Sequence, residues 1–385
     1  MPYQKNIKLR QYSPIIHFQS DQTGATLRAT EVKPKLDRFL LSKFKKASSL
    51  KTDQDLVQHT TYQKWVRRVA NERLSLKYKI SIKANDQNSN RGSISIISQE
   101  QRWIYSSNPI SLTFTSFYEE LLDQIDTYAN EFFAIHNFGK RQSKGWGSFM
   151  PNNIKSAEDF EKLLSSSGKV FFKRNRAFGD ELDGFDSVVN YEWRLLKSGL
   201  NPRENRGQYR KSLLFKYMCQ RGVRWEKKAI KQMINRIAEN THIPALKSDN
   251  PSVDCVRGED GCTDAITGEA IFNSDDNNHY GFVRAILGLP EHYEFLNERN
   301  GRYTIKVDSG DVKRFKSPVT FKIFDGHIYV MPEAIPSELF DATFSFTLKG
   351  VNTNVPPLRL TVPRNFDLEE FLTTYLRCIG YDRVN

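Results

Sequence analysis

The sequence predicts an α+β protein, and three observations support this class. The chain has 385 residues, which on length alone suggests two or three domains with cores of their own. Stretches with the alternating apolar pattern of strands are mixed with amphipathic helical stretches. The two kinds of stretch lack the regular succession that a parallel α/β protein shows.

The first half of the chain reads as strand, helix, strands and helix. A first strand is expected over residues 7–18, and a helix contains Pro34 early, where a helix tolerates proline. Ser75–Ile82 alternates strictly, as a half-buried strand does, and Tyr118–His136 carries one apolar stripe. This order fits a split βαβ, ferredoxin-like sheet with one or two inserts. Further strands are expected at 93–97 and 110–115, and a further helical stretch at 54–70.

The second half has the features of another α+β domain. The pair Asp325-Gly326 separates two apolar runs and predicts a hairpin. A final helix over 366–379 ends at Gly380, a residue type common at helix C-termini. We therefore expect an N-terminal domain at residues 1–165 and a second domain at 166–385 with a basic helical insertion at 203–240. Strands are also expected at 169–173 and 344–348, and a long polar loop at 248–278.

The balance of charge indicates a polyanionic partner, with a merely basic surface as the alternative. The formal net charge is +12 and the isoelectric point about 9.3, and contacts between cations and phosphates release condensed counterions. The N-terminus is polar, and no apolar run is long enough to cross a bilayer. Four scattered cysteines form no disulfide framework, and Cys255, Cys262 and His279 complete no zinc pattern. We expect a cytoplasmic protein with reduced thiols, no metal and no cofactor.

A glycine-rich segment at residues 138–149, FGKRQSKGWGSF, is the strongest local signal. Glycines let a backbone turn with positive φ and approach a ligand closely, and backbone N–H groups with nearby cations suit a phosphate chain. The tryptophan would stack on a base. The alternative is an ordinary helix-to-strand turn with the tryptophan in the core. The predicted contacts are Lys140, Arg141, Lys144 and Trp146, placed by Gly139, Gly145 and Gly147.

Two further segments are strongly basic. Residues 24–46 carry seven cations against two acids, and residues 203–236 carry eleven cations against two acids, interleaved with aromatic residues. Aromatic and cationic side chains together suit single-stranded RNA. The alternative in both segments is a solvated basic face over an apolar core. The candidate RNA contacts are Arg28, Lys33, Lys35, Arg38, Arg203, Arg206, Arg210, Lys211, Arg221 and Arg224.

Catalytic signatures are scarce. The seven histidines form no metal-binding pair of known spacing. His17, at the end of the first expected strand, would suit the general base of a metal-free ribonuclease. A lone histidine at a strand end is more often structural, so we expect no catalysis and keep His17 as the alternative.

Several motifs, taken in order, resemble the RAMP superfamily of CRISPR-associated proteins. SPIIHFQ is similar to its opening strand, and ATEVKPKLDRFL to the segment that leads into its first helix. FGKRQSKGWGSF is similar to its signature glycine-rich loop. RFKSPVTFKIFDGHIYVMP and VRAILGLP resemble segments of the large two-domain RAMP subunit of type III-B (Cmr) effector complexes, to which the chain is most similar.

This resemblance implies two ferredoxin-like (RRM-like) domains with helical and loop insertions. It also implies a non-catalytic subunit that binds guide RNA (crRNA) and target RNA, or their duplex, beside other subunits of a ribonucleoprotein complex. The alternatives are a metal-independent, guide-processing endoribonuclease of the same superfamily and a scaffold that binds only proteins.

Overall fold

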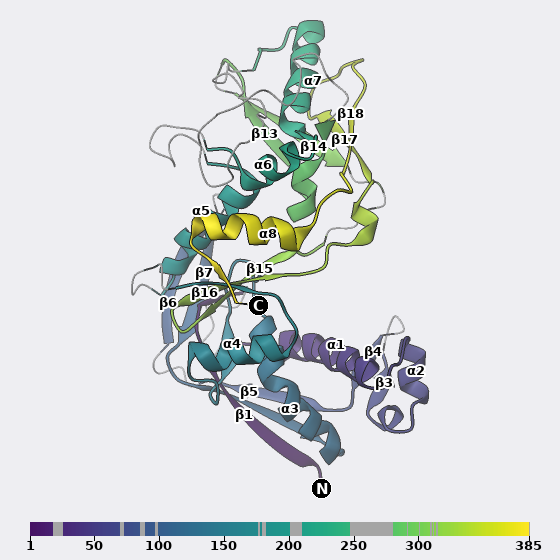
Figure 1. Cartoon of the computed structure of the whole chain (residues 1–385), viewed down its shortest axis with the longest axis vertical. Coiled ribbons are helices and arrows are strands. Elements are labelled where there is room, and N and C mark those ends of the chain that lie inside the picture. The colour runs from purple at the N-terminus through teal and green to yellow at the C-terminus, as the bar shows by residue number, and fades with distance from the viewer. Residues whose placement is uncertain are drawn as a thin grey trace. The chain divides into compact units, whose positions relative to one another are not determined.

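The computed structural model of the chain contains two compact units (Figure 1). Unit 1 comprises Met1–Val189, Thr320–Met331 and Arg383–Asn385, and unit 2 comprises Asn190–Val319 and Pro332–Asp382. The structure describes residues 1–17, 26–69, 73–84, 89–96, 99–175, 178, 182–200, 210–246, 280–290, 292–299, 301–308, 310, 312 and 315–384.

Unit 1 is built around an antiparallel sheet with the strand order β5-β8-β1-β9. The strands are β1 (Tyr3–Gln11), β5 (Lys79–Lys83), β8 (Ile110–Ser116) and β9 (Phe149–Pro151). Every second residue of β8 is buried, as its alternating sequence predicts. Along the chain, helix α1 (Ala29–Ala47) separates β1 from β5, and helix α3 (Glu119–Ile135) separates β8 from β9. The expected long helix at 118–136 is thereby confirmed.

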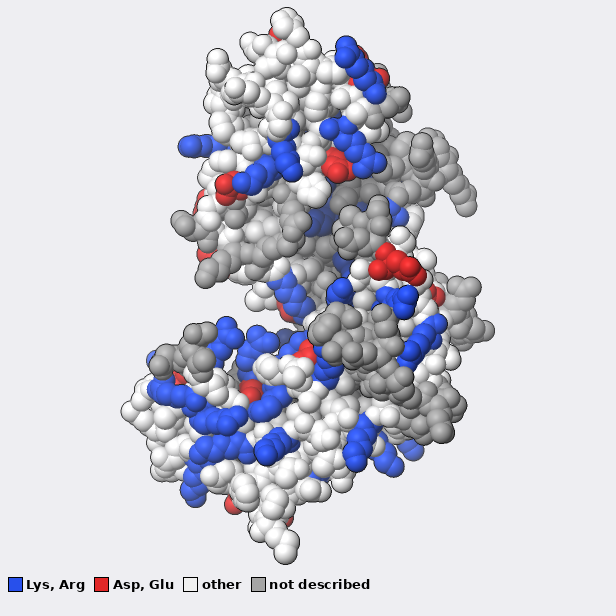
Figure 2. Space-filling view, turned by 180° about the vertical axis from the view of Figure 1, so that it is seen from behind, with Lys and Arg blue, Asp and Glu red and all other residues white. Residues whose placement is uncertain are grey.

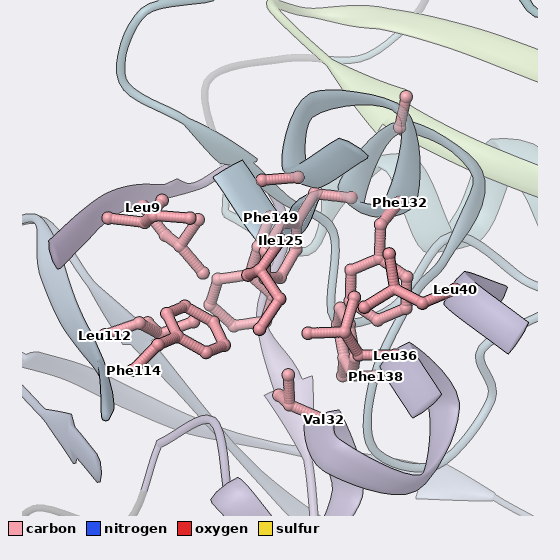
Figure 3. Close-up of a cluster of buried hydrophobic side chains, with 14 of the residues drawn as sticks. Leu9, Val32, Leu36, Leu40, Leu112, Phe114, Ile125, Phe132, Phe138 and Phe149 are labelled. Carbon is pink, nitrogen blue, oxygen red and sulfur yellow. The ribbon is translucent and has the colours of Figure 1, made fainter. Parts of the chain in front are cut away.

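The apolar stripes of α1 and α3 meet the inner face of this sheet (Figure 3). Leu36 and Leu40 of α1 and Phe132 of α3 lie in one cluster with the inward residues of β1 and β8. Each of these side chains is almost completely buried. Both α1 and α3 therefore pack on the inner face of the sheet, and neither covers its opposite face.

Three expected elements of unit 1 differ from the structure. The strand expected over 7–18 is two strands, because the chain leaves β1 at Gln11 and forms β2 (Ile15–Ile16) in a second sheet with β7 (Gln99–Ser106) and β6 (Ser89–Ile96). The helix expected over 54–70 is a short helix α2 (Asp53–Gln58), a 3₁₀ turn and strand β3 (Val66–Arg68), which pairs with β4 (Leu74–Leu76). The strand expected over 75–82 is divided between β4 and β5.

The other four-stranded sheet of unit 1, with the order β15-β16-β10-β19, brings distant parts of the chain into this unit. Strands β15 (Val319–Phe324) and β16 (His327–Pro332) form the expected hairpin, and both turn residues have positive φ, 49° at Asp325 and 74° at Gly326. β10 (Phe172–Arg174) pairs with β16, and β19 (Asp382–Arg383) lies at the edge. Phe324 stacks on Phe160 of helix α4 (Ala157–Ser166) at 4.6 Å between ring centroids.

A buried lysine fastens this hairpin to the first sheet. The Nζ of Lys322 donates to the carbonyl oxygens of Phe133 at 2.7 Å, His136 at 2.8 Å and Phe149 at 3.4 Å. Two of these carbonyls belong to the C-terminal end of α3, where a cation also meets the negative end of the helix dipole. Burial lowers the pKa of Lys322. Unit 1 thus contains residues from both halves of the chain.

Unit 2 contains a four-stranded antiparallel sheet, whose strands lie side by side in the order in which they occur along the chain. Its strands are β13 (His292–Leu296), β14 (Arg302–Asp308), β17 (Thr343–Leu348) and β18 (Leu358–Thr361). Phe282, just before a buried 3₁₀ turn at Val283–Leu287, contacts both Phe344 and Phe346 of β17 with ring centroids 5.0 Å apart. The helices named in this unit are α6 (Leu213–Cys219), α7 (Glu226–Thr241) and α8 (Leu368–Leu376), and α5 (Gly184–Lys197) continues into it from unit 1.

Other expectations for the second half have mixed outcomes. Gly380 ends the last helical segment with φ at 88°, as expected, and strands occur at the sites expected near 169–173 and 344–348. The expected loop at 248–278 lies outside the described residues. Cys219 and Cys378 are both disulfide-bonded, so the expectation of reduced thiols is wrong for these two residues.

Candidate nucleic-acid interface

Backbone hydrogen bonds join the glycine-rich segment to the β1–β2 connection, β2 and β15 of unit 1. Phe138 N–H donates to Gly147 O at 2.9 Å, Gly147 N–H to Pro14 O at 2.8 Å, and Lys140 N–H to Ile16 O at 2.6 Å. The N–H of Phe321, in β15, donates to Ser143 O at 3.1 Å. The N–H groups of Phe138, Lys140 and Gly147 therefore bind backbone carbonyls of the protein, and the N–H of Gly139 binds the carboxylate of Glu31.

The expectation that the glycines adopt positive φ is confirmed. The angles are 79° at Gly139, 82° at Gly145 and 71° at Gly147. A Cβ at Gly147 would lie 1.8 Å from Phe138 O, and one at Gly139 would lie 2.6 Å from Ile16 O. Both glycines are required by close backbone approach, so this part of the motif is explained by the fold alone.

Trp146 belongs to the core and does not face RNA, so the alternative interpretation is correct for this residue. Its side chain is fully buried, and its Nε1–H donates to Asp186 Oδ1 at 2.6 Å. Arg141 forms an ion pair with the same carboxylate at 3.0 Å. Lys144 is half-buried, with Nζ 5.7 Å from the centre of the Phe321 ring. Of the three predicted cations of this segment, Lys140 is exposed, and its Nζ donates to Gln101 at 2.6 Å.

The predicted cations in and beside α1 also include some that bind other parts of the protein and one that is exposed. Lys35 donates to Asn137 O at 2.8 Å and to Gln142 Oε1 at 2.6 Å, so it supports the glycine-rich segment. Lys33 contacts Asp37 at 2.9 Å and Leu76 O at 3.0 Å, and burial lowers its pKa. Arg28 is half-buried. Arg38 is exposed, with its Nε–H bonded to Pro34 O at 3.2 Å.

A basic surface lies near the β3–β4 pair, to which Lys33 of α1 binds. Lys33 and Asp37 bind the β3–β4 pair through Ser75 and Leu76, so α1 and this pair are neighbouring elements. Figure 2 shows Lys and Arg gathered over this part of unit 1, with few acids among them. We call the exposed cations of these elements the α1–β3 basic surface; they are Arg38, Lys46, Lys64, Arg67, Arg68 and Arg73. Only Arg38 was singled out from the sequence.

A second set of cations lies on the outer face of the first sheet. The register places Lys8 of β1 and Lys83 of β5 on either side of Ser111, and Lys79 beside Thr115. All three lysines are exposed, whereas the intervening residues Ile7 and Leu9 are buried. The alternation seen in the sequence would have predicted this face, since polar residues of a half-buried strand share the solvent side.

The basic segment of unit 2 is largely structural. Lys211 and Arg224 are buried, and Tyr217 packs against Phe366 and Phe371 with ring centroids 5.4 Å apart. Arg221 pairs with Glu370 at 2.6 Å and lies over the Tyr217 ring. Tyr217 and Trp225 are buried and are not stacking platforms, which corrects the sequence interpretation for these two residues. Arg210 is half-buried, and Arg203 and Arg206 lie outside the described residues.

A buried carboxylate organises the VRAILGLP segment of unit 2. Glu226, fully buried at the first turn of α7, accepts from the N–H of Val283 at 3.1 Å and from Arg284 Nε at 2.7 Å. The hydroxyl of Tyr293 donates to it at 3.0 Å. This segment is therefore held in the core of unit 2 by a charge-assisted network.

The ribonuclease alternative rests on His17. His17 is buried, with 7% of its surface exposed. Within the residues that the structure describes, no three His, Cys, Asp or Glu side chains are grouped for a metal ion. In the same part of the chain, no helix combines the length and apolar character that a bilayer crossing needs.

Profiles of two domain families match the chain in succession. The Cmr1 N-terminal domain matches residues 3–200, and the Cmr1 C-terminal domain matches residues 209–382. No curated protein sequence matches the chain.

Two solved structures resemble it weakly. Cmr1 from Pyrococcus furiosus in its apo form has 8% identity and a TM-score of 0.38, with 99% of this chain and 98% of that chain covered. A chain of the type III-B Cmr-β complex bound to cognate target RNA has 9% identity and a TM-score of 0.27, with 39% of this chain covered and 59%, less than two thirds, of that chain. The assignment rests on the two profiles, of which the first alone covers more than half of the sequence: the chain belongs to the Cmr1 family.

Proposed function

We propose that this chain is an RNA-binding subunit of a type III-B (Cmr) CRISPR effector complex, where it contacts guide RNA or the guide–target duplex beside other subunits. Its membership of the Cmr1 family and its net charge of +12 support this role. The observation that carries the proposal is the α1–β3 basic surface, whose six cations are exposed. Exposed cations bind phosphates without regard to base sequence, so base pairing within the RNA would supply specificity.

The two four-stranded sheets of unit 1 favour a pair of ferredoxin-like domains. The first sheet has the chain order β1-α1-β5-β8-α3-β9 and the spatial order β5-β8-β1-β9. The second has the chain order β10-α5-β15-β16-α8-β19, with the matching spatial order β15-β16-β10-β19. We infer that both are split βαβ units, and that the sheet of unit 2 is formed by two insertions into the second.

A test of RNA binding compares the wild type with the triple variant Arg38→Ala, Arg67→Ala, Arg68→Ala. The affinity for labelled single-stranded RNA is measured by fluorescence anisotropy at several salt concentrations. Wild-type affinity should fall steeply as salt rises, and the variant should lose about two units of the log–log slope, since each phosphate contact on a single strand contributes roughly 0.7. The matched control replaces Lys155, Lys162 and Lys169, three exposed lysines around α4, and should retain the slope. Salt-independent binding, or none, would exclude the proposal.

We further propose that the chain is not catalytic. The burial of His17 supports this, because a general base must reach the proton that it removes. Incubating purified protein with a guide precursor in the presence of a chelator tests the ribonuclease alternative. Cleavage that is abolished in His17→Ala while RNA binding persists would establish that alternative. A scaffold that binds only proteins would instead keep its partners after complete ribonuclease digestion.

A further inference from the structure

A pocket lies at the edge of the first sheet of unit 1, between β1, helix α3 and the turn that follows β9. Its volume is about 340 Å³, within the size range of pockets that hold small ligands. The polar residues that line it are Asn6, Lys8, Asp126, Asn130, Asn152 and Asn153. None of the RNA contacts predicted from the sequence lies among them.

The short length of β9 creates the pocket. β9 pairs only with Leu9–Gln11, so the N-terminal part of β1 extends beyond its partner. The chain then turns, with Ile154 N–H bonded to Pro151 O at 3.1 Å, and Asn152 N–H donates to Lys8 O at 2.9 Å. Backbone groups of alternate residues in a strand point to the same side, so the N–H and C=O of Asn6 face the same edge as Lys8 O.

One of the residues that line the pocket carries an acceptor without a hydrogen bond. The Oδ1 atom of Asn152 is buried and has no partner in the structure. A buried polar atom without a partner is costly and uncommon in native proteins. A ligand that donates a hydrogen bond at this position would remove that cost.

The chemistry of the lining selects the class of ligand. Asparagine side chains offer donors and acceptors without charge, and an asparagine amide can form two hydrogen bonds with the edge of adenine. Asp126 is paired with Lys5 at 3.0 Å, and Lys8 is exposed on the outer sheet face, where a phosphate would meet it. Single-stranded RNA is commonly recognised through bases that leave the stack and enter pockets.

We propose that this asparagine pocket holds one nucleobase that bears an exocyclic amine. The amine donates to Asn152 Oδ1, the amides of Asn130 and Asn153 complete the base edge, and Lys8 binds the adjoining phosphate. This inference rests on the proposed RNA binding, and it adds a preference among bases that the exposed cations alone do not give.

The test uses short RNAs of equal length made of adenosine or of purine riboside, which lacks the exocyclic amine. The wild type should bind the adenosine RNA about fivefold more tightly, the effect of one neutral hydrogen bond. Asn152→Leu should erase this ratio, and Asn152→Asp, which keeps an acceptor, should preserve it. Asn130→Leu places a larger apolar side chain at the α3 side of the pocket. This second variant should also lose the preference for adenosine RNA. The control Asn235→Leu changes an exposed residue of α7 and should behave as the wild type.

The outcomes separate this inference from the proposed function. RNA binding with a normal salt slope but equal affinity for the two RNAs would overturn the pocket and leave the basic surface intact. A preference that survives in both leucine variants would also overturn it. Loss of the preference for adenosine RNA in the two leucine variants, with an unchanged salt slope, would establish the pocket. Absence of all RNA binding by the wild type would instead exclude the proposed function itself.

Discussion

Cations that look alike in the sequence occupy three environments in the structure. Lys322 is fully buried against three carbonyl oxygens, and Lys33 is held by a carboxylate. Arg38, on the same helix as Lys33, is exposed. The net charge therefore overstates how many cations can meet a phosphate, because hydrogen bonds inside the protein already use some of them.

Lys197, at the end of α5 in unit 2, gives a prediction about pH. Its Nζ donates to Gly288 O at 2.5 Å, and burial together with the charge of Arg284 lowers its pKa to about 7. Between pH 7 and 10.5 the unfolded chain holds a proton on this lysine that the folded chain has released. The contribution of Lys197 to the free energy of unfolding should therefore rise with pH through this window, by up to about 1.4 kcal/mol per unit.

The measurement compares urea unfolding of the wild type and Lys197→Met at pH 6, 7.5 and 9. The stability of the wild type relative to the variant should increase from the lowest to the highest pH. A difference that stays constant, or that shrinks as the pH rises, would show that the pKa of Lys197 is not lowered in the folded protein.

At the scale of elements, one side of α1 packs against the rest of unit 1 and the other side is exposed to solvent. Lys33 and Lys35 face the β3–β4 pair and the glycine-rich segment, and Arg38 faces outward. The same is true of the glycine-rich segment, whose backbone joins β2, α1 and β15 while Lys140 remains exposed. Elements that were predicted to contact RNA thus mainly connect parts of the fold, and they carry a few exposed cations.

Two single variants of α1 should have opposite effects. Lys33→Met leaves the buried carboxylate of Asp37 without its cation and should lower the free energy of unfolding by about 3 kcal/mol. It should leave the salt dependence of RNA binding unchanged. Arg38→Ala should change stability by less than about 0.5 kcal/mol and flatten the salt slope by about 0.7. Thermal unfolding and anisotropy titrations check both, and a flattened slope in a folded Lys33→Met protein would contradict the assignment.

At the scale of the molecule, unit 1 depends on residues from the far end of the chain. Phe324, Tyr329 and Met331 belong to the same core cluster as Leu9 and Phe132. The domain boundary predicted after residue 165 divides the chain linearly, and the compact unit does not follow that division. That boundary stays a prediction.

A fragment of residues 1–165 should therefore fail to fold on its own. It lacks the β15–β16 hairpin, so Phe160 loses its stacking partner and the carbonyls at the end of α3 lose Lys322. Circular dichroism should show no cooperative thermal transition for the fragment under conditions in which the full chain unfolds cooperatively. A fragment that melts sharply at the midpoint of the full chain would show that the hairpin is dispensable.

The sequence alone determined the features that depend on residues close together in the chain, such as helices, turns and backbone angles. The apolar stripe of Tyr118–His136 predicted α3, the Asp325-Gly326 pair predicted the hairpin, and the glycines at 139, 145 and 147 predicted positive φ. The mixed α+β class was predicted correctly, and the order of the motifs led to the right family, which the domain profiles confirm.

Only the tertiary structure decided the environments of Trp146, Lys322 and the cations that were predicted to contact RNA. Trp146 is buried because Asp186, 40 residues later, accepts its hydrogen bond, and Lys322 is buried because its acceptors lie more than 170 residues earlier. The helix expected at 54–70 became α2 and β3 because pairing with β4 prevailed over local periodicity. Hydrogen bonds between such distant segments leave no local pattern in a single sequence.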